Sequence, residues 1–176
     1  PVYTLPKLKT FLETNGPWEQ LVKLKNIRTI ALFPDSLISL SSHVSVKAFP
    51  VPHRDEYSET AGFIMITPLK KYLFVPDIDK WEKWGRSIIN EVKQVDVALL
   101  DATFYSQTKL PARSMKEVPH PFVVETAALF KQEPVAIKKR VTFIHFNHTN
   151  PLLWDKQVRM EVQRNGFSIA VQGGKL

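Results

Sequence analysis

The stretch YLFVPDIDKWEKWGRSIINEVKQVDVALLD (residues 72–101) predicts a strand, a helix and a second strand in succession. Its helical part is marked by apolar residues that recur at helical spacing: Trp81, Trp84, Ile88, Ile89 and Val92. Residues 95–100 then form an apolar run interrupted only by Asp96. We expect Trp81 and Trp84 to share one helical face and to pack in the core or at its rim.

The rest of the chain extends this pattern in both directions. Downstream, we predict helices at 121–131 and 153–165 and strands at 140–146 and 167–171. Upstream, short helices at 7–13 and 17–25 precede a strand meander whose predicted strands span 28–33, 37–40, 44–51, 61–67 and 71–75. A meander followed by alternating strands and helices predicts an α/β (α+β mixed) fold, in which helices cover a mixed sheet.

The composition predicts a folded domain and excludes disulfides and several kinds of metal site. The chain has 176 residues, 44% of them hydrophobic and 23% charged, which predicts one folded domain over residues 1–176. The absence of cysteine excludes disulfides and cysteine-based zinc sites, so any metal site must use His, Asp or Glu. No apolar run approaches the roughly 20 residues that span a bilayer, and the first residues, PVYTLPKLKTFLE, lack the apolar core of a signal peptide. We therefore predict a cytoplasmic protein that does not contact a membrane.

The net charge of +7 permits attraction to anions but does not identify a partner. Basic residues are scattered, and aromatic residues do not alternate with them as a nucleic-acid stacking surface would require. Nucleic acid is a possible partner that the sequence does not favour.

Ionisable residues follow four of the predicted strands. His53 follows the strand ending at 51, Asp77 follows the strand at 71–75, and Asp101 and His145 end two later apolar runs. Strand ends gathered along one edge of a sheet make a natural site, because a rigid scaffold holds polar groups there without burying them in the core. Histidine and carboxylate together suit a divalent ion such as zinc, iron or manganese, so His53, Asp77 and His145 are the candidate ligands. The alternative for each is a capping or solvated residue.

Four motifs carry a resemblance to a known family: VPHRDEYSETAGF (51–63), LFVPDID (73–79), LLDATF (99–104) and FIHFNHTNP (143–151). In this order they resemble the second half of the metallo-β-lactamase fold, an αββα sandwich, and most of all the coenzyme PQQ synthesis protein B group. The resemblance implies the same three metal ligands by position, with Asp77 able to bridge two ions. The final motif in that group retains His at the position of His145 and has Asn at that of His148, which implies a pocket or hydrogen-bonding role for His148.

A more distant resemblance to ribonuclease Z concerns LDATF and VPHPFVVETAALF (118–130). It implies that Asp101 orients His120, which then donates a proton to a leaving group. The alternative is that Asp101 caps a turn and His120 is a loop residue.

Further polar residues lie close to these motifs in the sequence. Beside a metal, Arg54 would hold an anionic group, and Asp55 or Glu59 would support a ligand through hydrogen bonds. The alternative for all three is a solvated turn. Asn147 belongs to a tight turn after the strand and is a further candidate to reach the site.

The HxHxDH motif that marks the family is absent from this sequence. We therefore expect a single domain that lacks the N-terminal half of the fold and is completed by that half or by a partner chain. Three ligands alone would also bind metal weakly.

These observations lead to one predicted function and two alternatives. The first is a metal-dependent hydrolase, with zinc before iron or manganese, acting on an anionic, ester or phosphodiester substrate or a peptide-like one. The second is an iron-dependent oxidative enzyme similar to the PQQ synthesis protein. The third is a non-catalytic binding or interaction module that retains a remnant of the metal site.

Overall fold

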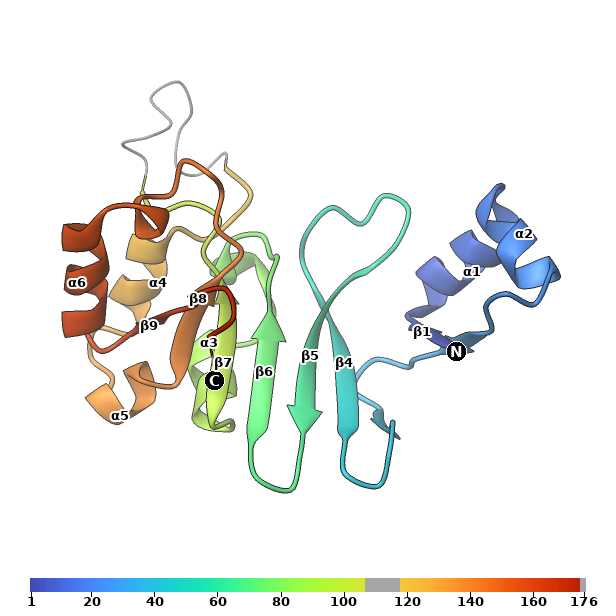
Figure 1. The fold of residues 1–176 in the computed structure, drawn as a ribbon, viewed down its shortest axis with the longest axis horizontal. Helices are drawn as coiled ribbons and strands as arrows, with labels where there is room; N and C mark the ends of the chain where they lie inside the picture. The colour runs from blue at the N-terminus through green and yellow to red at the C-terminus, as the bar shows by residue number, and fades with distance from the viewer. Residues whose placement is uncertain (107–117, 175–176) are drawn as a thin grey trace.

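The chain forms a seven-stranded mixed sheet and a separate two-stranded sheet (Figure 1) in a computed structural model that describes residues 1–106 and 118–174. The elements are, in chain order, β1 (Val2–Thr4), α1 (Pro6–Thr14), α2 (Trp18–Lys23), β2 (Thr29–Ala31), β3 (Leu37–Ser39), β4 (Ser45–Val51), β5 (Thr60–Ile66), β6 (Lys71–Val75), η1 (Trp81–Lys83), α3 (Ile88–Lys93), β7 (Val97–Asp101), α4 (Val123–Leu129), α5 (Val135–Lys138), β8 (Val141–Ile144), η4 (Pro151–Leu153), α6 (Lys156–Arg164) and β9 (Ser168–Ile169). None of the described helices has the length and apolar character that crossing a membrane requires.

The large sheet confirms the predicted α/β arrangement. Its order is β3-β4-β5-β6-β7-β8-β9, with antiparallel neighbours from β3 to β6 and parallel neighbours from β6 to β9. Parallel neighbours need crossover connections, and right-handed crossovers that advance in one direction along a sheet place their helices on the same face. The core accordingly joins apolar residues of α3, α4 and α6 to one face of the sheet.

The two tryptophans belong to this core, as predicted. Trp81 and Trp84 are each 7% exposed, and Trp84 stacks on Phe49 of β4 with ring centroids 5.6 Å apart. Their indole N–H groups donate hydrogen bonds to Thr126 Oγ1 (2.9 Å) and to the Pro50 carbonyl oxygen (3.2 Å). Each ring therefore buries its apolar surface while its polar atom is satisfied.

Two predictions about elements were wrong in detail. The strand predicted at 28–33 does not join the meander, since β2 pairs in parallel with β1 in the small sheet. The helix predicted from the tryptophan spacing is divided into η1 and α3, and α3 begins where Ser87 Oγ accepts from the N–H of Asn90. Three short elements were not predicted: β1, α5 and η4. The other predicted elements occur where expected, several of them with shorter bounds.

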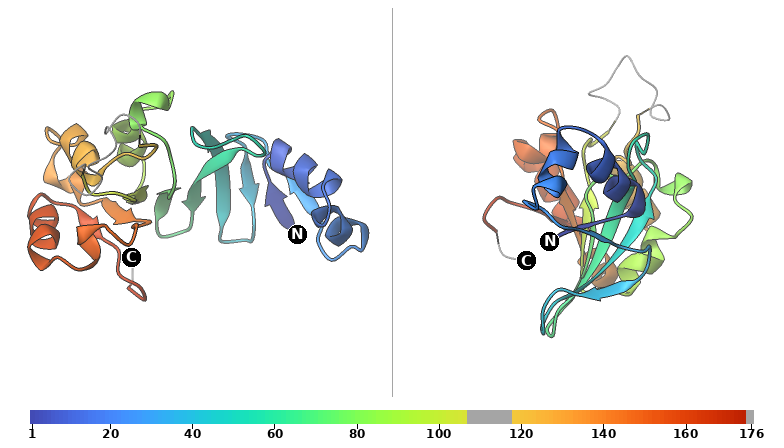
Figure 2. Two further views of the ribbon diagram at one scale, coloured as in Figure 1. Left: turned by 90° about the horizontal axis from the view of Figure 1, so that it is seen from above. Right: turned by 90° about the vertical axis from the view of Figure 1, so that its right-hand side faces the viewer.

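The two small helices and the two-stranded sheet form a unit at the opposite end of the molecule from α4, α5 and α6, as Figure 2 shows. Leu5 and Leu32 from this unit pack with Ala48 of β4 in a second, smaller cluster of buried residues. This cluster attaches the unit to the large sheet.

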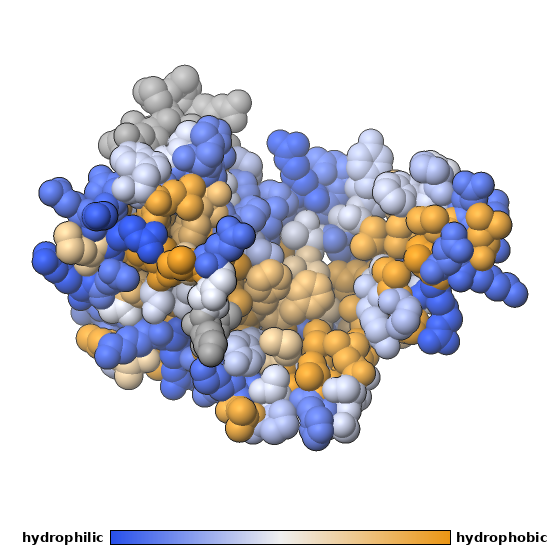
Figure 3. Space-filling view, viewed as in Figure 1, coloured by the Kyte–Doolittle hydropathy of each residue, from blue (hydrophilic) through white to orange (hydrophobic). Residues whose placement is uncertain are grey.

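The second face of the large sheet presents apolar side chains over β4 to β7. They line a hollow of about 760 Å³, and the residues are Val46, Phe63, Met65, Tyr72, Phe74, Leu99 and Gly174. Figure 3 shows apolar side chains gathered over these strands. Met65 and Phe74 are each 38% exposed, although both are large and apolar. Contiguous exposed apolar surface is uncommon on monomeric proteins.

We expect copies of this chain to associate through the apolar sheet face. Phe74→Lys places a charge in the middle of this face, so it should lower the weight-average mass measured by light scattering at high concentration. Leu69→Lys is the matched control, because Leu69 is 92% exposed in the turn between β5 and β6. A wild-type chain that stays monomeric throughout the concentration series would contradict the expectation.

Candidate metal centre

The direction of the strands brings the predicted site residues together. β4 and β6 run in the same direction because both are antiparallel to β5, and β6, β7 and β8 are parallel neighbours. Their carboxyl ends therefore lie along one edge, the upper edge in Figure 1. His53, Asp77, Asp101 and His145 stand at or directly after these four ends, and His120 joins them from the segment before α4.

Asp101 is the centre of the arrangement, with no exposed surface. Its Oδ2 accepts from the backbone N–H of Ile78 (3.2 Å) and lies 2.9 Å from His120 Nδ1. Its Oδ1 accepts from the N–H and the hydroxyl of Thr103, at 2.8 and 2.7 Å. Burial acts to raise the pKa of Asp101, but the hydrogen bonds from His120 and Thr103 and the nearby His145 ring, whose Nδ1 lies 3.6 Å from Oδ1, outweigh it and hold the pKa at about 2. Asp101 is therefore an ionised carboxylate in the protein interior.

The network around Asp101 also fixes which nitrogen of His145 carries a proton. The Thr103 hydroxyl has one hydrogen, which it donates to Asp101, so it accepts from His145 Nδ1 across 2.9 Å. A neutral His145 then presents the lone pair of Nε2. The Asp101 carboxylate, whose Oδ1 lies 3.6 Å from His145 Nδ1, raises the pKa of His145, while burial acts to lower it. The backbone at His145 is left-handed (φ 61°), a conformation that is uncommon outside glycine and clusters at functional sites.

A second carboxylate, that of Asp79, fixes the ring of His53. His53 Nδ1 lies 3.3 Å from Asp79 Oδ1, and Asp79 is fixed by its N–H bond to the Pro52 carbonyl (2.6 Å) and by Lys83 Nζ (3.0 Å). With Nδ1 donating to Asp79, Nε2 carries the lone pair and faces Asp77 Oδ2 at 3.3 Å. A carboxylate partner on Nδ1 is the usual support of a histidine that binds metal through Nε2.

The residues around Asp77 fit a divalent cation. The Nε2 lone pair of His53 and the Asp77 carboxylate are both acceptors, so they repel at 3.3 Å unless a proton or a cation lies between them. Two donors held about 2.0–2.1 Å from one tetrahedral ion lie roughly 3.4 Å apart, which is close to this distance. Asp77 Oδ1 is buried and has no hydrogen-bond partner among the described residues. Donor atoms of Asp77 also lie within 4.8 Å of those of both His120 and His145.

His120 joins the same cluster through its Nδ1 atom. Its Nδ1 donates to the ionised Asp101 and lies 3.4 Å from Asp77 Oδ1. Its ring packs near those of His53 and His145, with centroids 5.3 and 6.4 Å away. Nε2 of His120 is therefore the atom that can exchange a proton or bind an ion. His120 also groups with His53 and Asp77 as a possible set of ligands.

Five other predicted residues make no contact with the side chains of this cluster among the interactions of the described residues. Arg54 and Asp55 are exposed in the loop after β4, and His148 is exposed in the turn after β8. The Glu59 carboxylate accepts from the backbone N–H groups of Lys7 (2.9 Å) and Leu8 (3.3 Å), so it caps α1. Asn147 Oδ1 accepts from the N–H and hydroxyl of Thr149 and shapes the predicted turn.

The sequence reasoning missed two residues that support the site. Asp79 belongs to the quoted motif LFVPDID, and Thr103 belongs to LLDATF. A second carboxylate two residues after a candidate ligand was a usable signal for Asp79. The role of Thr103 depends on the pairing of β7 with β8, which places it beside His145.

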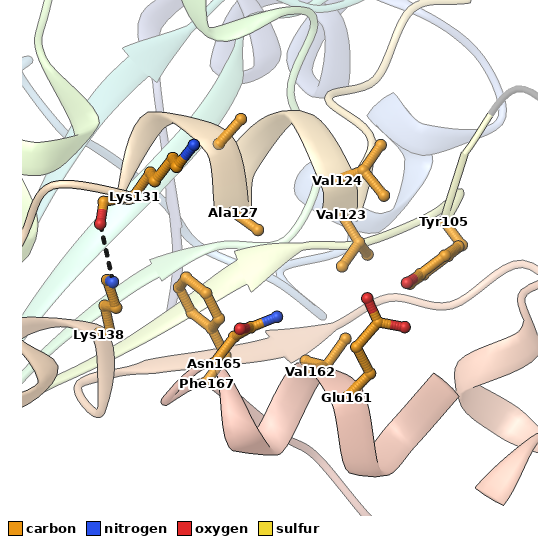
Figure 4. Close-up of a pocket in the computed structure, with 11 residues that line it drawn as sticks. Tyr105, Val123, Val124, Ala127, Lys131, Lys138, Glu161, Val162, Asn165 and Phe167 are labelled. Atoms are coloured by element: carbon orange, nitrogen blue, oxygen red, sulfur yellow. Dashed lines mark hydrogen bonds between the residues drawn. The ribbon is translucent and has the colours of Figure 1, made fainter. Parts of the chain in front are cut away.

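A separate hollow of about 320 Å³ lies between α4 and α6 (Figure 4). It is lined by Tyr105, Val123, Val124, Ala127, Ala128, Lys131, Lys138, Glu161, Val162, Asn165 and Phe167. Lys138 Nζ donates to the Lys131 carbonyl oxygen across one end (3.0 Å). None of the five clustered residues lines this hollow, so it is distinct from the candidate metal centre.

The profile of the beta-lactamase superfamily domain matches residues 1–173. No curated protein sequence matches the chain.

Three solved structures share the fold at low sequence identity. Zn²⁺-bound PqqB from Methylobacterium extorquens is 20% identical with a TM-score of 0.65, over 96% of this chain and 61% of that one. A diphosphatase from the PhnP family is 14% identical with a TM-score of 0.64, over 97% and 54%. The metallo-beta-lactamase fold protein YhfI from Bacillus subtilis is 13% identical with a TM-score of 0.58, over 88% and 58%. The chain thus spans between half and two thirds of the length of these relatives.

Replacing Asp101 should destabilise the fold. Asp101→Asn puts an NH₂ group among donors and removes a buried charge, which we expect to cost about 2–4 kcal/mol of unfolding free energy at pH 7. Because folding lowers the pKa from 3.8 to about 2, the ionised carboxylate stabilises the protein above pH 4, and this contribution is lost as the pH falls toward 2. Urea unfolding of both proteins at several pH values measures the difference.

Asp96→Asn is the control for this experiment. Asp96 is exposed and accepts one backbone hydrogen bond, from Lys71 (2.7 Å). Its replacement should cost less and show no comparable change with pH. Equal losses in the two variants at pH 7 would contradict the central role assigned to Asp101.

Proposed function

Because the chain belongs to the beta-lactamase superfamily, we propose that it is a metal-dependent hydrolase acting on an anionic ester or phosphodiester. His53, Asp77 and His145 hold the ion, and zinc is the first candidate. The observation that carries the proposal is the pair of facing acceptors, His53 Nε2 and Asp77 Oδ2, 3.3 Å apart. The zinc bound to PqqB and the activity named for the PhnP-family diphosphatase support the metal and the reaction class.

A bound divalent ion supplies Lewis acidity and lowers the pKa of water in such sites. The protein's own residues supply positioning and proton transfer. Asp79 and Thr103 fix the rings of His53 and His145 so that each presents Nε2. When the His120 ring is protonated on both nitrogens, Asp101 holds the Nδ1–H group, and the Nε2 proton passes to a departing alkoxide or phenoxide oxygen, which leaves the ring neutral.

The metal-binding part of the proposal is tested by metal content. We expect near-stoichiometric zinc in the wild-type chain after equilibrium dialysis, and at least a tenfold loss of affinity in His53→Ala, Asp77→Ala and His145→Ala, because each removes a ligand. His43→Ala is the matched control, since His43 is exposed in the turn between β3 and β4. Elemental mass spectrometry gives the ratio. A wild-type chain without metal, or an equal loss in His43→Ala, would count against the site.

The proton-donor role of His120 predicts a dependence on the leaving group. His120→Ala should lower kcat by roughly 10²–10⁴-fold on a phenyl phosphodiester. The loss should be much smaller on the p-nitrophenyl counterpart, whose leaving group departs without protonation. Zinc content should stay within a fewfold of the wild-type value. A loss of the same size on both substrates would show that His120 does not act as the acid.

A further inference from the structure

Lys80 is a buried lysine that joins two of the segments carrying the metal centre. It follows Asp77 by three residues and is 4% exposed. Its Nζ lies 2.6 Å from Oε2 of Glu125 on α4. Lysine is almost never buried unless it is paired, because its charge loses hydration. The ion pair therefore bridges the loop after β6 and the first turn of α4.

Glu125 connects this ion pair to the segment that carries His120. The same Oε2 accepts a hydrogen bond from the backbone N–H of Phe122 (2.8 Å), which is the residue before α4 begins. Lys80 Nζ also lies 4.2 Å from the centre of the Phe122 ring. Phe122 has no exposed surface and follows His120 by two residues. Lys80 and Glu125 thus fix the backbone immediately after His120.

Aromatic packing continues the connection to the imidazole. Phe122 contacts Phe104 edge to face, with centroids 6.2 Å apart, and Phe104 contacts the His120 ring in the same manner at 5.8 Å. The neighbour of Lys80, Trp81, adds the buried hydrogen bond to Thr126 of α4. The loop carrying Asp77 is therefore attached to α4 at two adjacent positions.

Stability alone does not account for an ion pair in which Lys80 is buried and Glu125 is half-buried. The Coulombic gain of such a pair is offset by the hydration that the buried lysine loses, so replacing a buried pair with apolar residues is often neutral or stabilising. What the pair adds is a fixed geometry between two segments. Here those segments place Asp77 Oδ1 and His120 Nδ1 3.4 Å apart.

We propose that Lys80 and Glu125 are positioning residues that set the orientation of His120 against Asp77 and Asp101. They touch neither substrate nor ion and act through Phe122 and the start of α4. The significance of this for metal binding rests on the proposed function, whereas the orientation of His120 can be measured without metal.

The test uses the full chain with Lys80→Met and Glu125→Gln combined. This pair of changes removes both charges, Met is only one atom shorter than Lys, and Gln has the length of Glu and retains an acceptor for the Phe122 N–H. Lys93→Met combined with Glu133→Gln is the matched control, because that ion pair (2.9 Å) joins the end of α3 to the segment after α4. Imidazole ¹⁵N NMR on metal-free protein reads the tautomer of His120, and Co²⁺ titration reads affinity and the visible absorption bands.

In the wild type and the control, we expect His120 to be protonated at Nδ1 when neutral. In the Lys80–Glu125 variant it should shift toward the tautomer mixture of free imidazole, and Co²⁺ affinity should fall roughly 10–100-fold with altered absorption bands. An unchanged His120 signal in a folded variant would overturn the proposal and leave the pair a purely structural feature. If the double variant does not fold, the single variant Glu125→Gln, which keeps the acceptor for the Phe122 N–H, is measured instead. The ¹⁵N signal of His120 in that variant then tests the proposal.

These outcomes separate the inference from the proposed function. A wild-type chain that binds no Co²⁺ contradicts the metal-dependent hydrolase, while the His120 tautomer still decides whether Lys80 and Glu125 position the ring. Metal binding that is intact in both variants, together with an unchanged tautomer, would overturn only the inference.

Discussion

An ionised carboxylate can lie in a protein interior only when hydrogen-bond donors surround it, and Asp101 imposes this requirement on the site. Its two oxygens take donors from three places: the backbone of the loop after β6, Thr103 in the chain after β7, and His120 before α4. Thr103 then carries the connection to His145 after β8. One buried charge therefore fixes the relative positions of several segments, and the tautomers of two histidines follow from it.

The sheet makes this arrangement possible because the four strands that precede the site residues, β4, β6, β7 and β8, run in the same direction. Parallel pairing from β6 to β8 puts three carboxyl ends side by side, and the β4–β5 hairpin returns the chain so that His53 reaches the same edge. Polar groups there occupy the boundary between a buried sheet and solvent. The side-chain exposure ranges from none at Asp101 to 45% at His145. The site thus has a rigid interior end and an accessible outer end.

The strands and most of the clustered residues could be predicted from the sequence, because the apolar runs and the ionisable residues that follow them indicate the same positions. Apolar runs locate the strands, and the first ionisable residue after each run marks the edge, as at Asp77 and His145. The sequence could not identify Thr103 or Glu125, since their roles depend on which strand lies beside β7 and on where α4 begins. It also placed β2 in the meander, because a short apolar run does not reveal its partner, which is β1. Glu59 was misleading for a related reason: it lies close to His53 in sequence, but its carboxylate reaches the start of α1.

The three histidines of the site, His53, His120 and His145, differ in the group that fixes each ring, and the residue type alone does not reveal this difference. Each has Nδ1 engaged by an oxygen, which leaves Nε2 for the site, but the oxygens differ: Asp79 for His53, Asp101 for His120, and the Thr103 hydroxyl for His145. His120 shares the buried charge that also fixes the loop after β6, so the orientation of its ring and the position of that loop depend on the same carboxylate. Donor atoms of His53 and of His145 each lie within 4.8 Å of a donor atom of Asp77, and each ring is fixed by a different partner.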